Sequence, residues 1–279
     1  MIDLAITITT FSMMVMLFKY FDKIRVNNLI AITFNYFTAG TLALSSYLLE
    51  NSFIELKTNT NLNLVIIALI IGTLFVITFN LYAYSAQKTG ITLSTISNKM
   101  SMVIPILIGI ILFKEEVTFF KIIGVFLALG AIVFSSKEDK KSKKLSQLNI
   151  IILFLLFIGQ GLADGLLNWG QRNILNSQNM NLFFTLTFLF AGFTGGLYSF
   201  FKIKTSNLKM DKKSIFWGII LGIPNYLTLL YFIKSLKSEL FSSYQVFPIV
   251  NIGVIVMCTS LSVILFQEKV SIFKWVGVG

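Results

Sequence analysis

The chain has 279 residues, of which 56% are hydrophobic and 13% are charged, and its formal net charge is +11. Soluble domains carry about 25% charged residues, so this composition excludes an ordinary soluble domain and predicts an integral membrane protein. The positive charge does not indicate nucleic-acid binding, because the lysines stand in short runs between apolar segments and the only arginines are Arg25 and Arg172.

The residue types also limit the chemistry of the chain, which contains no histidine and a single cysteine, Cys258. Histidine metal sites, histidine proton relays and Ser-His-Asp catalysis are therefore excluded, and Cys258 has no partner for an internal disulfide. We expect no catalytic residues, no metal and no cofactor, and hence a protein that is not an enzyme.

Ten apolar segments follow one another along the chain, and all but the last are near the length of about 20 residues that a membrane span needs. The first lacks the basic region and the cleavage site of a signal peptide, so we expect it to remain as a span. The segments are Ile2–Tyr20, Asn28–Leu49, Leu62–Ala86, Ile91–Phe113, Thr118–Ser136, Leu148–Trp169, Asn181–Phe201, Ser214–Ser235, Leu240–Phe266 and a last one from Ser271. All should be α-helices, because in hydrocarbon every backbone amide must be bonded within its own segment.

The most charged stretch, Lys137–Lys144, divides the chain near its middle. We therefore predict a first five-helix repeat over residues 1–136, a charged connecting loop over 137–147 and a second repeat over 148–279. The last segment stops at Gly279, whereas its counterpart runs on to Ser136. Either the final helix is truncated or the chain is a fragment, and we favour a fragment.

A repeated motif supports this division into two halves. Phe113–Ile122 reads FKEEVTFFKI and Phe266–Trp275 reads FQEKVSIFKW, each after a long apolar run. The offset between them is 153 residues without a gap, and Asn98 and Asn251 share it. Because five is an odd number of helices, the second half enters the membrane from the opposite side. This predicts an all-α fold of two inverted five-helix repeats, with the solute site between the halves.

The motif also carries a family resemblance. The residues concerned are Leu112–Thr118 (LFKEEVT) with Gly124 and Gly130, and Leu265–Ser271 (LFQEKVS) with Gly277. Together with the five-plus-five segments, they resemble the EamA-like branch of the drug/metabolite transporter (DMT) superfamily. The resemblance implies a transporter of small organic solutes with a cytoplasmic N-terminus.

The prolines depart from the family pattern, in which a proline precedes the motif glutamate at a set distance. Here Pro105 lies ten residues before Glu115, and Pro248 lies twenty before Glu268. Which proline breaks its helix stays open. Since both glutamates stand at span ends, we expect them to have a structural role at the loop into the next helix.

The orientation in the membrane has two competing interpretations. The loops after the odd-numbered segments hold most of the lysines and arginines, which favours a cytoplasmic location for these loops and an N-terminus outside. The family resemblance implies the reverse. We give the charge bias more weight, because it recurs in several short loops.

Two ionisable residues lie inside spans, where a charge is costly and indicates function. They are Lys99 and Asp164, and they differ in depth by about seven positions, or ~10 Å at 1.5 Å per residue. We therefore expect no direct ion pair, but a shared polar pathway. The alternative for each is a side chain that extends along its helix to the headgroups.

Asp164 belongs to a polar stripe with Gln160, Asn168 and Gln171 on one helix face, flanked by glycines that permit close packing. The alternative is a seam that only holds helices together. Asp164 is also the candidate for proton or cation coupling. The substrate-pathway candidates are Asn80, Tyr84, Asn98, Lys99, Gln160, Asp164, Asn168, Asn225, Tyr244, Gln245 and Asn251.

These observations predict a multi-pass secondary transporter of the cytoplasmic membrane that moves a small organic metabolite, such as an amino acid, by alternating access. Its expected partners are the lipid bilayer, the solute and a coupling proton or cation, with no nucleic acid; a homodimer stays open. The alternative is a channel or a membrane interaction protein that transports nothing.

Overall fold

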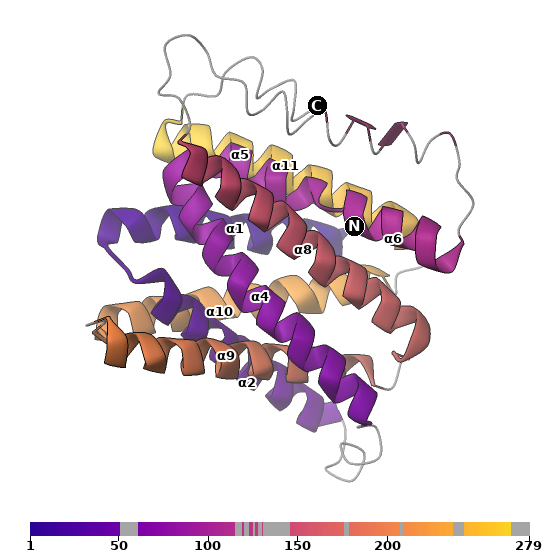
Figure 1. Cartoon of the computed structure of the whole chain (residues 1–279), viewed down its shortest axis with the longest axis horizontal. Coiled ribbons are helices and arrows are strands. Elements are labelled where there is room, and N and C mark those ends of the chain that lie inside the picture. Colours follow the sequence, from indigo (N-terminus) through magenta and orange to yellow (C-terminus); the bar gives the residue numbers. More distant parts are fainter. Residues whose placement is uncertain are drawn as a thin grey trace. The chain divides into compact units, whose positions relative to one another are not determined.

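The computed structural model describes residues 1–50, 61–114, 146–175, 179–206, 209–236 and 243–268, together with a few single positions between 119 and 130. These residues are helical and include no strand. The helices are α1 (Ile2–Ile24), α2 (Asn28–Glu50), α4 (Leu62–Thr89), α5 (Ile91–Met100), α6 (Val103–Phe113), α8 (Gln147–Asn173), α9 (Met180–Thr205), α10 (Lys212–Leu236) and α11 (Ser243–Phe266) (Figure 1).

Eight segments of the described chain are long and apolar enough to cross a membrane. They match predicted spans one to four and six to nine, so the all-helical membrane class is confirmed. The predicted spans Thr118–Ser136 and from Ser271, the residue Glu115 and the charged stretch Lys137–Lys144 fall outside the described residues. Ten helices and an inverted arrangement therefore stay predictions.

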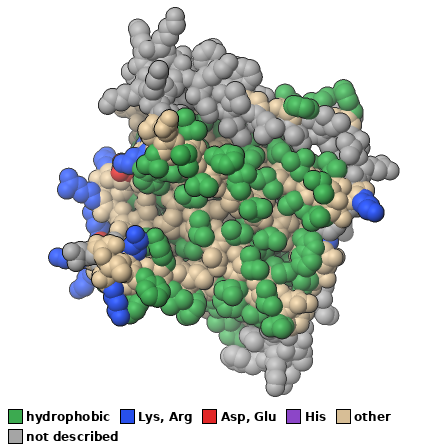
Figure 2. All heavy atoms as spheres, in the orientation of Figure 1, with side chains coloured by type: hydrophobic (Ala, Val, Ile, Leu, Met, Phe, Trp, Pro, Cys, Tyr) green, Lys and Arg blue, Asp and Glu red, His purple; other side chains and the backbone are tan. Residues whose placement is uncertain are grey.

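The surface of the described residues is suited to lipid. Large hydrophobic side chains are exposed along several spans, among them Ile111, Phe154 and Ile264. Figure 2 shows hydrophobic side chains over much of the visible face, with lysine and arginine side chains mainly near one margin. Because lipid tails favour apolar side chains, these faces need no protein cover.

The helices form two compact units, and each unit draws on both halves of the sequence. The first contains residues 1–23, 81–165 and 228–279, and the second contains residues 24–80 and 166–227. Helices α4, α8 and α10 each contribute one end to either unit. The predicted halves, 1–136 and 148–279, were inferred from a repeated motif in the sequence and are a different division from these two units. They stay a prediction.

The second unit is held together by close helix packing with small residues. Helix α2 packs along α9, where a Cβ added to Gly192 would lie 2.9 Å from the Phe37 ring. Helix α10 approaches α2 in the same way, since a Cβ on Gly222 would lie 2.7 Å from the backbone oxygen of Asn35. Such contacts are typical of membrane helices, which associate by close packing and interhelical hydrogen bonds.

The first unit contains α1, α5, α6 and α11 with the adjoining ends of α4, α8 and α10. Helix α5 packs against α11, and the hydroxyls of Thr92 and Ser262 lie 3.3 Å apart across this contact. The two charged candidate residues, Lys99 and Asp164, both belong to this unit.

The fourth predicted span is divided into two helices, α5 and α6, by a turn at Ser101 and Met102. Pro105 has no N–H to donate to the Ser101 carbonyl, and its ring would crowd that oxygen. The carbonyl instead accepts from Ile104 N at 2.9 Å, three residues on. The break in the fourth span thus lies next to Pro105, whereas α11 continues through Pro248.

The two copies of the sequence motif end their helices alike. Helix α6 ends at Phe113 and α11 ends at Phe266. The next residues, Lys114 and Gln267, both have a left-handed backbone, with φ of 50° and 53°. This shared ending is a local likeness between the halves, at the same 153-residue offset as the sequence motif.

Candidate functional site

A chain of polar side chains joins α5 to α8 inside the first unit. Asn98 donates from Nδ2 to Gln160 Oε1 at 3.3 Å, and Gln160 donates from Nε2 to Asp164 Oδ1 at 2.9 Å. Asn98 is buried, while Gln160 and Asp164 are half-buried. Gln160 therefore accepts from one neighbour and donates to the other, and it connects a helix of the first sequence half to a carboxylate of the second.

Small residues let α8 come close enough for these contacts. A Cβ added to Gly161 would lie 2.7 Å from Ile104 Cβ, and one added to Gly165 would lie 2.5 Å from Ile108 Cδ1. Gly161 and Gly165 are four residues apart on α8, and Ile104 and Ile108 are four residues apart on α6. The same faces of α6 and α8 therefore lie together along one helical turn. The predicted role of these glycines in close packing is confirmed here.

A further hydrogen bond fixes α5 to α8 about two turns of α8 away from Gln160. The Ser97 hydroxyl donates to the backbone oxygen of Leu153 at 2.8 Å. Both groups are buried. In an apolar environment the bond satisfies two polar groups that lipid could not solvate.

Lys99 lies in the last turn of α5, where a cation is favoured by the helix dipole. Its ammonium stands 3.5 Å from the centre of the Phe11 ring, a cation–π contact that partly replaces water around the charge. The ion pairs of the described residues do not include one between Lys99 and Asp164, as the difference in depth predicted.

Asn251 of α11 also faces the break between α5 and α6. Its Nδ2 donates to Met102 Sδ at 3.5 Å. The repeat counterparts Asn98 and Asn251 thus both lie in the first unit. Each makes a contact to another helix, which is consistent with polar residues that face protein and not lipid.

Other candidates are placed elsewhere. Asn80 donates to the Val76 carbonyl of its own helix at 2.8 Å, and Asn168 accepts from Arg172 Nε at 3.1 Å on α8. Asn225 is buried in the second unit, where it donates to Asn35 Oδ1 at 3.1 Å. Tyr84 is half-buried in the first unit.

Three side chains of the sequence prediction lie outside the described ones, namely those of Gln171, Tyr244 and Gln245. For the rest of the polar stripe on α8, the structure joins Gln160 to Asp164. It leaves Asn168, which belongs to the other unit, bonded within its own helix.

Several polar residues were missed by the sequence prediction. The sequence could have pointed to Asn35, because burying an amide inside an apolar span costs free energy unless the amide finds a hydrogen-bond partner. The Tyr82 hydroxyl donates to Thr95 Oγ1 at 2.8 Å in the first unit. No periodic pattern pointed to this bond, since it depends on how α4 turns into α5.

Comparison with known proteins gives the family of the chain. Residues 2–137 match the EamA-like transporter family. Over 254 residues the chain is 28% identical to an uncharacterised protein of Haemophilus influenzae, a match that covers 89% of this chain and 84% of that protein. With these helices and this match, the chain is a multi-pass membrane protein whose residues 2–137 match the EamA-like transporter family, within the DMT superfamily.

Proposed function

We propose that the chain is a secondary transporter of the cytoplasmic membrane that moves a small organic solute by alternating access. The observation that carries this proposal is the hydrogen-bonded chain from Asn98 through Gln160 to Asp164. A membrane helix bundle has no need of a carboxylate inside a span unless the group binds something, because burying a charge there is costly.

The origin of these residues supports the same proposal. Asn98 comes from the first half of the sequence, and Gln160 and Asp164 come from the second. In transporters built from inverted repeats, the solute binds between the repeats, and rocking of one repeat against the other exposes it to each side in turn. The polar chain would then be remade or broken as the two halves move.

Asp164 is the group proposed to couple transport to a proton or cation. It can bind and release a proton as its access alternates, and the amide of Gln160 can donate to its ionised form. The sequence contains no glycine-rich phosphate-binding loop that would indicate ATP as the energy source. An ion gradient, or the gradient of the solute itself, is the proposed driving force.

The solute proposed is a small zwitterion such as an amino acid. The side chains in and next to the polar chain offer one carboxylate, one ammonium and several amides, which together complement separated positive and negative groups. Asp164 and Lys99 would bind the two charges of the solute, and Asn98 and Gln160 would supply hydrogen bonds.

The experiment begins with the purified full chain and a library of metabolites. A solute that raises the melting temperature is then tested for counterflow in proteoliposomes. The proposal expects saturable uptake that is accelerated by the same solute on the opposite side. Flux that rises linearly with concentration and shows no counterflow would identify a channel instead.

A further inference from the structure

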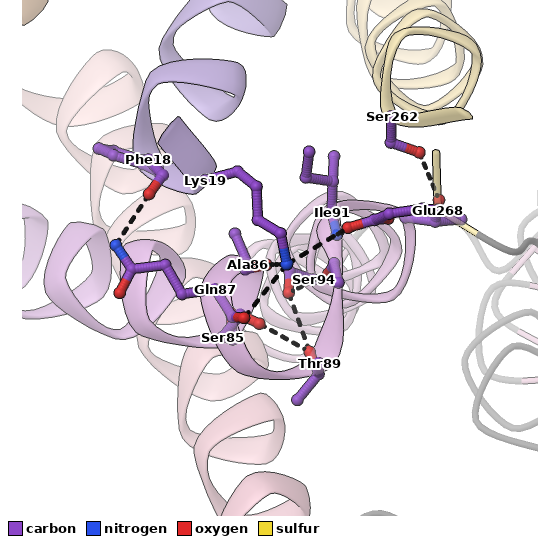
Figure 3. Close-up of polar contacts among 12 residues, drawn as sticks. Phe18, Lys19, Ser85, Ala86, Gln87, Thr89, Ile91, Ser94, Ser262 and Glu268 are labelled. Carbon is purple, nitrogen blue, oxygen red and sulfur yellow. Dashed lines mark hydrogen bonds and ion pairs between the residues drawn. The ribbon is translucent and has the colours of Figure 1, made fainter. Parts of the chain in front are cut away.

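A second polar cluster lies at the ends of the helices of the first unit, away from the polar chain. We define the helix-end cluster as Lys19, Gly90, Ile91 and Glu268. Figure 3 shows Lys19, Ile91 and Glu268 of this cluster. The Glu268 carboxylate accepts from Ile91 N, at 3.0 Å to Oε1 and 3.1 Å to Oε2. Lys19 Nζ lies 3.6 Å from Glu268 Oε1.

Each charge of the cluster satisfies a helix end. The Glu268 carboxylate occupies the N-terminus of α5, whose first N–H groups have no partner inside the helix. Lys19 donates to the Ala86 and Gln87 carbonyls at 3.2 and 3.1 Å in the last turn of α4, where a cation is favoured. The side chains of Lys19 and Glu268 are only 22% and 16% exposed.

Helix α5 lacks a cap of its own, which makes Glu268 its cap. The residue before the helix is Gly90, with a φ of 95° and no side-chain hydrogen bond to the helix. A Cβ at this position would lie 3.2 Å from Glu268 Oε2. The cap thus comes from the second half of the sequence, whereas a serine or aspartate at the N-cap would have supplied it locally.

The remaining contacts tie α1 and the α4–α5 turn together within the first half of the sequence. Gln87 Nε2 donates to the Phe18 carbonyl at 2.8 Å, and Ser94 Oγ donates to the Gly90 carbonyl at 2.7 Å. Glu268 follows α11, and its backbone N–H bonds back to the Ser262 carbonyl at 3.2 Å. The cluster therefore joins the α4–α5 turn in the first half of the sequence to the end of α11 in the second half.

Helix α5 is bounded by a conformational break at each end. Gly90 precedes it, and the turn at Ser101 and Met102 follows it. Breaks of this kind are where a helix can tilt as a unit. Because Asn98 and Lys99 lie near the far end of α5, a tilt that separates α5 from α11 at Ile91 would also move these two residues.

From this arrangement we propose that Lys19 and Glu268 are positioning residues that hold α5 against α11 at one face of the membrane, and that this contact opens once in each transport cycle. The proposal rests on the alternating access proposed above. The sequence prediction gave Glu268 a structural role at the loop into the following helix. In the structure the Glu268 carboxylate caps α5, and the helix predicted to follow Glu268 lies outside the described residues.

A buried reporter on the α5–α11 contact tests this proposal without any known solute. Thr92 is 1% exposed and lies against Ser262. Thr92→Cys in a Cys258→Ala background, in the full chain in oriented membrane vesicles, is labelled with a membrane-impermeant maleimide from either side. The intact cluster should keep labelling slow from both sides.

Weakening the cluster should open one side only. Lys19→Met and Glu268→Gln are each expected to raise the labelling rate from the face that carries the α4–α5 turn by about tenfold, the scale of a lost cap and ion pair. Gly90→Ala, whose Cβ would displace the Glu268 carboxylate, should act in the same direction. Lys19→Arg keeps the charge and the donors, and its labelling rate should stay as slow as that of the intact cluster.

The matched control is Lys23→Met, which removes an exposed lysine one turn further along α1 and should leave the rate unchanged. A cluster that is only a static cap would lower the melting temperature of the variants without changing the labelling. That result, or equal acceleration from both faces, would overturn the proposal. Failure of the counterflow assay would reject the proposed transport but would leave the labelling result as measured.

Discussion

Gln160 and Asp164 stand one helical turn apart on α8 and share a hydrogen bond of 2.9 Å, with the amide of Gln160 as donor. The same Gln160 side chain accepts from Asn98 of α5. Its orientation is therefore fixed from both sides, because an amide turned the other way would present its NH₂ group to Asn98 Nδ2 and its oxygen to the carboxylate. The Asp164 carboxyl group is thereby linked to α5 through the Gln160 side chain.

Replacing Asp164 by asparagine should remove the negative charge and keep the hydrogen bond from Gln160. Asp164→Asn keeps an oxygen that can accept from Gln160, so the free energy of unfolding should change by less than about 1 kcal/mol. Solute uptake in proteoliposomes should lose its dependence on an imposed pH gradient. Asp22→Asn, which removes an exposed carboxylate on α1, serves as the control. Unchanged pH-dependent uptake in Asp164→Asn would reject the coupling role.

Removing the Gln160 amide should destabilise the fold. Gln160→Leu leaves the Asp164 carboxylate and the buried Asn98 amide without this partner, at a cost of about 1–3 kcal/mol in the free energy of unfolding. Asn168→Leu, on the same face of α8 and hydrogen-bonded to the exposed Arg172 side chain, should cost less than about 1 kcal/mol. Denaturant unfolding in detergent measures both, and equal losses would contradict the bridging role.

The two glycines of α8 should differ in their tolerance of a methyl group. In Gly161→Ala the new Cβ meets Ile104 of α6, and overpacking of this kind costs about 1–3 kcal/mol. In Gly170→Ala the nearest contact is Ile67 Cγ2 at 3.7 Å, an ordinary separation. That variant should be neutral or gain up to about 1 kcal/mol from helix propensity. Melting temperatures compare them directly, and a tolerant Gly161 would show that α6 and α8 are not in such close contact.

The buried amide pair of the second unit should behave as a coupled pair. Asn35→Leu and Asn225→Leu each leave one buried amide without its partner at 3.1 Å, at about 1–3 kcal/mol apiece. The double variant should cost less than the sum of the two, because no partner is left unsatisfied. A double-mutant cycle by denaturant unfolding gives the coupling energy, and additive losses would mean that the two side chains are independent.

Orientation can be decided with cysteines in two loops that the charge bias assigns to opposite sides. Ser142 belongs to the charged stretch predicted as the connecting loop, Ser52 belongs to the predicted loop after the second span, and each is replaced by cysteine. The charge bias expects Ser52→Cys, and not Ser142→Cys, to be labelled from outside intact cells. The reverse pattern would support the cytoplasmic N-terminus that the family resemblance implies.

Much of the fold was predictable because the membrane leaves few choices. A chain this apolar must form helices of span length, and the helices that contain the eight described spans begin and end within a few residues of the predicted segments. Helix α8 runs from Gln147 to Asn173 and so extends beyond the predicted segment Leu148–Trp169 at both ends, into polar residues. Hydropathy detects the apolar stretch but not these extensions.

The membrane class, the family resemblance and the positions of the costly polar residues could be predicted from the sequence, because each depends on composition, spacing or a local motif. The sequence could not predict that Asn225 pairs with Asn35, that Asn80 bonds to its own helix, or that Glu268 caps α5. These contacts depend on which helices become neighbours and how the helices are rotated, because in lipid a buried polar group must bond to whatever partner packing brings within reach.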